Sequence, residues 1–324
     1  MAETSPINSP MAAKRDFRVA DYAPTYGALA ALVLLLVLNL VFTNNFADFD
    51  NFRNILVQVA PTMLVAVGMT FVISTGGIDL SVGSIMAIAS AVAAVSLDYG
   101  AGAAIFLGLA AAVLIGAFNG FLISNFKIQP IVITLAVLIA GRGIAQVISS
   151  GGQLIPFSNT NFEYLGKGII AGIPFQIILL ILVVGLAIFV LRATIFGRYI
   201  IAVGGNEEAA RLSGVRVNWT KVSVYAISGL LAGVAGLIYT ARLGASDASK
   251  VGDGIELDAI AATVVGGTAL TGGRATIIGT VIGALIMQII TTSFNMNGIK
   301  FSYSLVIKAA IILLAVYIQR PKMN

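Results

Sequence analysis

The chain of 324 residues contains no cysteine and no histidine. Without cysteine it has no disulfide bonds and no thiolate nucleophile, and without histidine it lacks the commonest metal ligand and the usual acid–base group near neutral pH. It also lacks the P-loop pattern G-x-x-x-x-G-K-[ST], so it does not hold ATP in the P-loop manner. We therefore expect no catalytic residue, no metal site and no cofactor bound by this chain.

Charged residues are also scarce, at 10% of the chain, whereas an ordinary soluble domain has about 25%. Hydrophobic residues make up 58% and the mean hydropathy is +0.99, which excludes a soluble globular protein and predicts an all-α, polytopic protein in contact with membrane lipid. The net charge of +5 comes from basic residues spread over separate loops rather than gathered on one aromatic-rich face. We therefore expect no nucleic-acid partner.

Long apolar runs are what the sequence has in abundance. A helix that crosses a membrane needs about 20 apolar residues. The runs predict about ten transmembrane helices, near 26–43, 54–74, 79–97, 101–125, 128–149, 168–191, 222–243, 257–271, 275–294 and 302–319. The stretches 76–84 and 266–273 are rich in glycine and fit broken or re-entrant spans. The predicted organisation is a tail at 1–25, a membrane domain at 26–320 and a short C-terminus at 321–324.

The basic residues indicate how the chain is oriented. No small-residue cleavage site follows the first apolar run, which favours an uncleaved first helix over a signal peptide. With the N-terminus inside, twelve basic residues fall on the cytoplasmic side, namely Lys14, Arg15, Arg18, Lys127, Arg192, Arg198, Arg211, Arg216, Lys221, Arg274, Arg320 and Lys322. Five fall on the other side, namely Arg53, Lys167, Arg242, Lys250 and Lys300. The positive-inside rule thus predicts cytoplasmic termini and a cytoplasmic loop at 192–221.

This polar loop contains the local signals of one short helix. An asparagine can cap the helix, two glutamates suit its positive end, an arginine suits its last turn, and a glycine can end it. Because a two-turn helix is not stable alone in water, we expect it to dock on a partner. The residues assigned to docking are Asn206, Glu207, Glu208, Ala209, Ala210, Arg211, Leu212 and Gly214.

Several polar residues lie inside the predicted spans. A carboxylate at membrane depth usually faces a cavity or caps a helix, and we favour Asp79 as a cap that accepts the amides of Ser81 or Val82 over direct contact with a solute or proton coupling. Arg142 and Lys308 either face a water-filled pathway, where they can bind a polyol, or snorkel to the interface. Amides can contact a solute or only bridge helices. The candidate pathway residues are Asp79, Ser81, Ser84, Asn119, Arg142, Gln146 and Lys308.

Two further patterns leave alternatives open. The string Thr-Gly-Gly at 75–77, followed by small residues at 83–84, recurs with identical spacing at 271–273 and 279–280. This indicates either a parallel internal repeat or a coincidence in a chain with 35 glycines. The outward segments 44–53, 150–167 and 244–256 hold most of the acidic residues and either receive a soluble partner or simply face solvent.

Six motifs occur in order over residues 50–320: VGMTFVI at 67–73, GGIDLSVGS at 76–84, KIQP at 127–130, GRY at 197–199, GGNEEAARLSG at 204–214 and GIELDAIA at 254–261. With them the chain resembles permease subunits of bacterial ATP-binding cassette (ABC) importers for sugars, in the branch of the ribose, xylose and galactofuranose permeases. The resemblance implies a fold like that of type II ABC importers in the bacterial inner membrane.

The resemblance also implies partners. Segment 204–214 would be the coupling helix, which sits in a groove of cytoplasmic ATPase subunits that bind ATP and Mg²⁺. A second permease copy or a paralogue would complete the pathway, and a periplasmic binding protein would deliver a pentose, hexose or cyclitol. Two alternatives from other classes are an ion-coupled secondary transporter, with Asp79 as the titratable group, and a membrane enzyme that uses carboxylates.

Overall fold

The computed structural model describes residues 23–158 and 160–319, so residues 1–22 of the predicted tail, with Lys14, Arg15 and Arg18, lie outside the described part. Arg320 and Lys322 lie outside it as well. The described elements are α1 (Ala23–Phe42), α2 (Phe49–Ser74), α3 (Val82–Val95), η2 (Leu97–Tyr99), α4 (Ala101–Phe126), α5 (Pro130–Ile148), β1 (Ile155–Pro156), α6 (Thr160–Lys167), β2 (Ile169–Ile170), β3 (Ile173–Pro174), α7 (Phe175–Ala193), α8 (Ile195–Gly205), α9 (Glu207–Leu212), α10 (Val217–Leu243), β4 (Ala245–Ser246), α11 (Ile255–Val265), α12 (Ile277–Met296) and α13 (Phe301–Gln319).

Each predicted span contains a helix, but seven rather than ten of the described helices are long and apolar enough to cross a membrane. These seven are α1, α2, α4, α5, α7, α10 and α12. The other three predicted spans correspond to α3, α11 and α13, and α3 and α11 have only 14 and 11 residues. At about 1.5 Å per residue, neither reaches across the hydrocarbon core of a bilayer.

Both glycine-rich stretches interrupt the helices, at residues 75–81 and 266–276, which explains the two short helices and confirms the expectation of broken spans. Between α2 and α3 the chain turns at Gly76, whose φ is 79°. Between α11 and α12 it turns at Gly267, Gly272 and Gly273, with φ of 94°, 83° and 75°. A positive φ strains any residue with a Cβ, so glycine is the residue suited to these turns.

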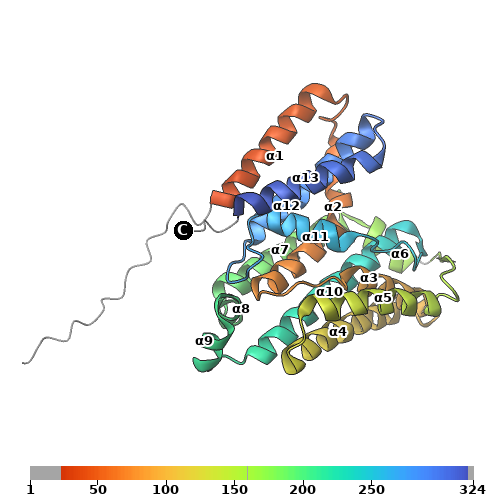
Figure 1. Cartoon of the computed structure of the whole chain (residues 1–324). Helices are drawn as coiled ribbons and strands as arrows, with labels where there is room; N and C mark the ends of the chain where they lie inside the picture. Colours follow the sequence, from red (N-terminus) through yellow and green to blue (C-terminus); the bar gives the residue numbers. More distant parts are fainter. Residues whose placement is uncertain (1–22, 159, 320–324) are drawn as a thin grey trace, which may run out of the picture.

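Helices α3, α4 and α10 pack against one another on the side of the molecule away from α1 and α13 (Figure 1). Helix α10 lies against both α2 and α4. Its contact with α4 is close because small residues face each other: a Cβ added to Gly229 would collide with the carbonyl of Ala112, and one on Gly116 would collide with that of Tyr225. Small residues at such contacts let two backbones approach and gain dispersion energy where the hydrophobic effect is absent.

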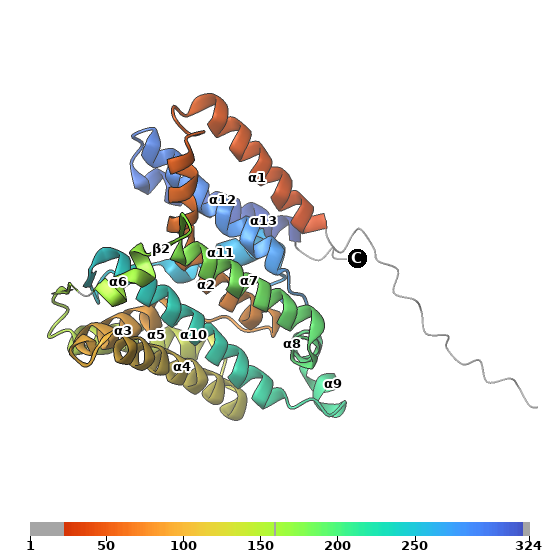
Figure 2. The ribbon, with the colours of Figure 1, turned by 180° about the vertical axis from the view of Figure 1, so that it is seen from behind.

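Helices α1, α12 and α13 form one edge of the molecule, and Figure 2 shows this edge from behind. Helix α1 packs on α12, and α13 packs on α11 and α12. The outer surfaces of α1 and α13 are apolar and exposed, for example Val41 at 69% and Leu313 at 71%. Such surfaces suit contact with lipid chains or with another membrane helix.

The segments between the long helices add two small strand pairs. Strand β1 pairs antiparallel with β4, and β2 pairs with β3 in a hairpin whose turn holds Ala171 and Gly172 at positive φ. The predicted span at 168–191 therefore begins later than expected, at Phe175, because the hairpin occupies its first residues. Helix α6 packs against α10 and lies far from α9 (Figure 1).

Candidate functional site

The short helix predicted in the polar loop is present as α9, and its cap signals are confirmed. The side-chain oxygen of Asn206 accepts a hydrogen bond from the Ala209 amide at 2.9 Å. At the other end Gly214 has a φ of 83°, and the amide of Val215 donates to the carbonyl of Ala210 at 3.0 Å. The glycine at positive φ and the hydrogen bond from Val215 to Ala210 end the helix, as the sequence predicted.

Glu207 also connects α9 to the next helix. Its two oxygens accept hydrogen bonds from Arg211 at 3.1 Å and from Lys221 of α10 at 2.6 Å. Partial burial raises the pKa of Glu207, but the hydrogen bond and charge of Lys221, with those of Arg211, outweigh this effect and leave the pKa below its ordinary value. The link to Lys221 was missing from the sequence prediction, since no helical spacing relates residues in separate helices.

Only a small part of α9 packs against the rest of the chain. Ala210 is buried in a cluster with Val203 of α8 and Val217 of α10. Glu208 and Ala209 are exposed, and Leu212 is 82% exposed, which is high for a leucine. The free surface of α9 is therefore available for a partner, as expected for a helix that docks.

Sequence analysis missed α8, the amphipathic helix that leads into α9. Thr194 caps it by accepting a hydrogen bond from the Gly197 amide at 3.2 Å, and Ile200 and Val203 are buried. The sequence predicted loop at 195–205 because the segment is too short for a span. The signal that could have found it is the threonine cap followed by apolar residues at helical spacing.

Helix α8 ends against both helix breaks. A Cβ on Gly204 would collide with the carbonyl oxygen of Ser74 and lie 2.5 Å from the nitrogen of Gly273. One on Gly272 would lie 2.8 Å from both the oxygen of Gly204 and the nitrogen of Gly76. A backbone hydrogen bond of 3.0 Å from Gly273 to Ser74 joins the two breaks directly. We call this three-way contact the glycine junction.

The glycine junction also relates the two copies of the Thr-Gly-Gly string. Both copies lie at helix breaks, and the breaks touch each other. The two strings thus have the same packing role, because each supplies glycines at a point where two backbones approach closely.

Strands β1 and β4 lie at the end of α10 opposite to α9. Helix α10 begins at Val217, five residues after α9, and ends at Leu243, two residues before β4. Its 27 residues are about 40 Å long, roughly the thickness of a bilayer with its headgroup regions. The segments 150–167 and 244–256 therefore meet on the face of the molecule away from α9.

Asp79 is fully buried at the first break and holds a polar network together. Its Oδ1 accepts hydrogen bonds from the amide and the hydroxyl of Ser81 at 3.1 and 2.6 Å, and its Oδ2 accepts one from Ser228 of α10 at 2.8 Å. The Asn119 amide of α4 donates to the Ser81 hydroxyl at 2.8 Å. The predicted hydrogen bond from the Ser81 amide is present, but the N-cap of α3 is Ser81 itself, so Asp79 stabilises the turn before the helix and joins the break to α10.

Four candidate pathway residues are buried in helix contacts in this conformation. Asp79, Ser81, Ser84 and Asn119 each have 0% exposure, and Ser84 donates hydrogen bonds to the carbonyls of Ser81 and Val137. Direct contact with a solute would require a different arrangement of the helices. Their assignment to a pathway remains a prediction.

Two of the other candidates, Arg142 and Gln146, contact the segment that follows β4. The Arg142 guanidinium donates to the carbonyls of Ala248 and Val251 at 3.1 and 2.6 Å, and Gln146 donates to Ser249 at 3.4 Å. Both side chains thus face the segment that follows β4, and this segment was not predicted as their partner.

Lys308 has a partner in a neighbouring helix that the sequence analysis did not predict. It is only 6% exposed and forms an ion pair with Asp258 of α11, with distances of 3.0 and 3.1 Å from Nζ to the two carboxylate oxygens. It therefore does not snorkel to the interface, and its assignment to a pathway remains a prediction. Pairing offsets the cost of a buried ammonium group, which is why α13 can hold a lysine in the middle of its sequence.

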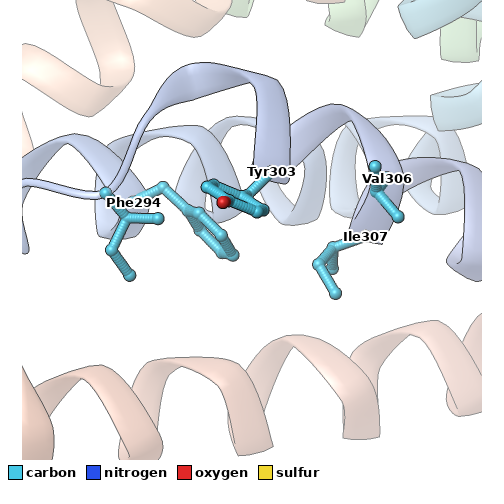
Figure 3. Close-up of a pocket in the computed structure, with 5 residues that line it drawn as sticks. Phe294, Tyr303, Val306 and Ile307 are labelled. Atoms are coloured by element: carbon cyan, nitrogen blue, oxygen red, sulfur yellow. The ribbon is translucent and has the colours of Figure 1, made fainter.

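A shallow pocket of about 320 Å³ lies along α12 and α13, and Figure 3 shows its side chains. It is lined by Phe294, Ile299, Tyr303, Val306 and Ile307. With one hydroxyl among five side chains, it offers too few hydrogen bonds for a polyol. Within residues 23–158 and 160–319, no group of three or more Asp or Glu side chains is placed to hold a metal.

Comparison with known proteins identifies the class of the chain. Residues 51–316 match the family described as branched-chain amino acid transport system / permease component. The chain belongs to this family of permease components. It is thus a multi-pass membrane transport subunit rather than an enzyme, and the resemblance inferred from the motifs is confirmed.

The permease is similar to the ribose import permease protein RbsC of Escherichia coli K12, with 41% identity over 91% of this chain and 93% of RbsC. It is 38% identical to the galactofuranose transporter permease protein YtfT of the same organism, over 95% of this chain and 92% of YtfT. A solved ABC transporter of metal-chelate type, in an inward-facing conformation, has the same fold with a TM-score of 0.52 and 12% identity over 90% of this chain and 98% of that one.

Proposed function

We propose that this permease imports a monosaccharide across the bacterial cytoplasmic membrane as the membrane-spanning subunit of an ATP-driven ABC importer. The observation that carries the proposal is 41% and 38% identity to permeases named for ribose and galactofuranose, over more than nine tenths of the chain. A pentose, a hexose and a cyclitol remain candidate substrates, because these two relatives of similar identity are named for different sugars.

In this proposal α9 is the coupling helix, docked on a cytoplasmic ATPase subunit that binds ATP and Mg²⁺. The exposed surface around Leu212 supports docking, and the glycine junction offers a mechanical route from α8 to both helix breaks. Closure of the ATPase dimer would move α9 and α8 together. The helix breaks would then shift, and the permease would alternate between inward and outward openings.

The remaining assignments follow from this orientation. With α9 in the cytoplasm, both termini are cytoplasmic and the 192–221 loop is the coupling loop. The paired segments 150–167 and 244–256 lie on the periplasmic face and receive the sugar-binding protein. A second copy of the permease, or a paralogue, completes the pathway against the exposed apolar surfaces.

The docking assignment is tested by Leu212→Ser, with Leu154→Ser as a matched control. Leu154 is 55% exposed and lies just before β1, on the opposite face. We expect Leu212→Ser to lower both co-purification of the ATPase and sugar-stimulated ATP hydrolysis, because docking would bury an apolar side chain worth about 1.5–3 kcal/mol. Leu154→Ser should leave ATPase binding unchanged. Equal ATPase binding by both variants would remove α9 from the interface.

The energy source is tested in proteoliposomes with radiolabelled ribose, galactofuranose, xylose and inositol. We expect uptake of one of them only when the ATPase, the binding protein and ATP are all present, and no effect of an uncoupler. Uptake by the permease alone that an uncoupler abolishes would instead support an ion-coupled transporter that uses Asp79.

A further inference from the structure

A crevice of about 570 Å³ opens between α1, α7, α8 and the start of α12. We call it the arginine crevice. Its lining includes Tyr26, Leu29, Arg192, Ile201, Arg274 and Ile278. Two arginines in a largely apolar crevice are unusual in a chain with so few charged residues.

Within residues 23–158 and 160–319, neither arginine has an ion-pair partner. The four ion pairs found within the described residues involve other side chains, and no acidic residue lines the crevice. The Nη2 atom of Arg274 is buried and has no hydrogen-bond partner among the described residues. An unpaired guanidinium nitrogen shielded from water is costly, so this arrangement favours an anionic ligand.

The remaining walls indicate what else the ligand contains. Tyr26, Leu29 and Ile278 are 58%, 44% and 47% exposed and present apolar surface on α1 and α12. Arg192 lies in the last turn of α7, and Arg274 lies three residues before α12. The charges thus lie at the ends of membrane-crossing helices, at headgroup level, and the apolar surface continues along the helices toward the hydrocarbon.

We propose that the arginine crevice binds an anionic phospholipid, with the phosphate between Arg192 and Arg274 and the acyl chains along α1 and α12. A lipid combines in one molecule the negative charge and the apolar length that the crevice presents. Basic pockets between transmembrane helices have this chemistry in general. A free phosphate would satisfy the arginines but would leave the apolar walls uncovered.

The position of Arg274 gives this lipid a route to transport. The Ser74 hydroxyl donates to the Arg274 carbonyl at 3.2 Å, and the neighbouring Gly273 donates to the carbonyl of Ser74. Arg274 is therefore attached to the glycine junction, where α8 meets both helix breaks. A lipid held by Arg274 anchors this junction to the bilayer.

The test measures lipid retention by the full-length permease, purified from nanodiscs that contain equal amounts of phosphatidylglycerol and phosphatidylcholine. Native mass spectrometry should show wild-type protein retaining phosphatidylglycerol preferentially. The double variant with Arg192→Gln and Arg274→Gln should reduce that preference about 25-fold, which corresponds to roughly fivefold for each arginine. The control, Arg198→Gln with Arg216→Gln, removes two exposed arginines that do not line the crevice and should keep the wild-type preference.

Three results would overturn the proposal. The first is equal retention of the two lipids by wild-type protein. The second is an unchanged preference in the Arg192/Arg274 double variant. The third is displacement of the lipid by millimolar glycerol phosphate, which would indicate a free-phosphate site. If the double glutamine variant does not fold, Arg192→Gln alone and the double lysine variant replace it, with reduced preference expected for the first and retained preference for the second.

Discussion

Replacing Gly204 by alanine tests whether the glycine junction transmits motion from the coupling helix to the membrane helices. The added methyl group would lie 2.5 Å from the nitrogen of Gly273 and would overlap the carbonyl oxygen of Ser74, whereas ordinary contacts begin at 3.4 Å. Helix α8 must therefore retreat by about 1 Å or more. Backbone atoms cannot move aside as a flexible side chain does, so the shift would loosen α8 from both helix breaks.

The adjacent Gly205→Ala is a closely matched control, because a Cβ at Gly205 meets no atom within 4 Å. Overpacking at Gly204 should cost about 1–3 kcal/mol. Alanine at Gly205 should instead stabilise the end of α8 by up to about 1 kcal/mol, since alanine favours helix more than glycine does. The two variants should therefore differ in free energy of unfolding by about 1–4 kcal/mol, with Gly204→Ala the less stable.

The assays are the unfolding temperature of the purified permease and the sugar-stimulated ATPase activity of the assembled complex. We expect Gly204→Ala to lower both and Gly205→Ala to lower neither. Equal behaviour of the two variants would refute the close contact. A lower unfolding temperature with unchanged ATPase stimulation would show that the junction is structural and does not couple the subunits.

Three further predictions concern the polar contacts. Asp79→Ala leaves buried hydroxyls without an acceptor and should lower the free energy of unfolding by about 1–3 kcal/mol per hydroxyl, while Asp79→Asn keeps most of the stability; equal unfolding temperatures for the two variants would contradict this. Asp258→Asn should destabilise the permease more than Lys308→Met does. It leaves the Lys308 ammonium group, on a side chain only 7% exposed, without a counter-charge, whereas Lys308→Met leaves a carboxylate on a side chain that is 36% exposed. A lower unfolding temperature for Lys308→Met than for Asp258→Asn would contradict this prediction. Because the pKa of Glu207 is lowered below 4.5, its ion pairs are fully formed above that pH and are lost as the pH falls through the lowered pKa. Hydrogen-exchange protection factors of the α9 amides, which are corrected for the intrinsic pH dependence of exchange, should thus stay constant down to pH 4.5 and fall below it. Lys221→Met should move this fall to higher pH, and the absence of that shift would exclude the pair as its cause.

Sequence reasoning predicted the features that depend on neighbouring residues. Long apolar runs located a helix in every predicted span, and glycine clusters located both helix breaks, because these signals act within one or two turns of the chain. The caps of α9 at Asn206 and Gly214 were predicted for the same reason. Helix α8 was not predicted, since its eleven residues are too few for a membrane span.

Other features depend on how helices pack, and the sequence alone did not predict them. Lys308 reads as an isolated charge in an apolar run until α13 lies against α11 and brings Asp258, 50 residues away, within 3.0 Å. Gly204 is one glycine among 35, and only the meeting of α8 with the two breaks makes its missing side chain necessary.

The sequence by itself thus determined that this is a membrane protein, where its helices lie and to which family of transport subunits it is similar. The tertiary structure decided which charges are paired, as in Lys308 and Asp258, and which have no ion-pair partner among the described residues, as in Arg192 and Arg274. The physical reason is range: hydropathy and capping act along the chain, whereas ion pairs and close backbone contacts depend on the register between helices that are distant in sequence.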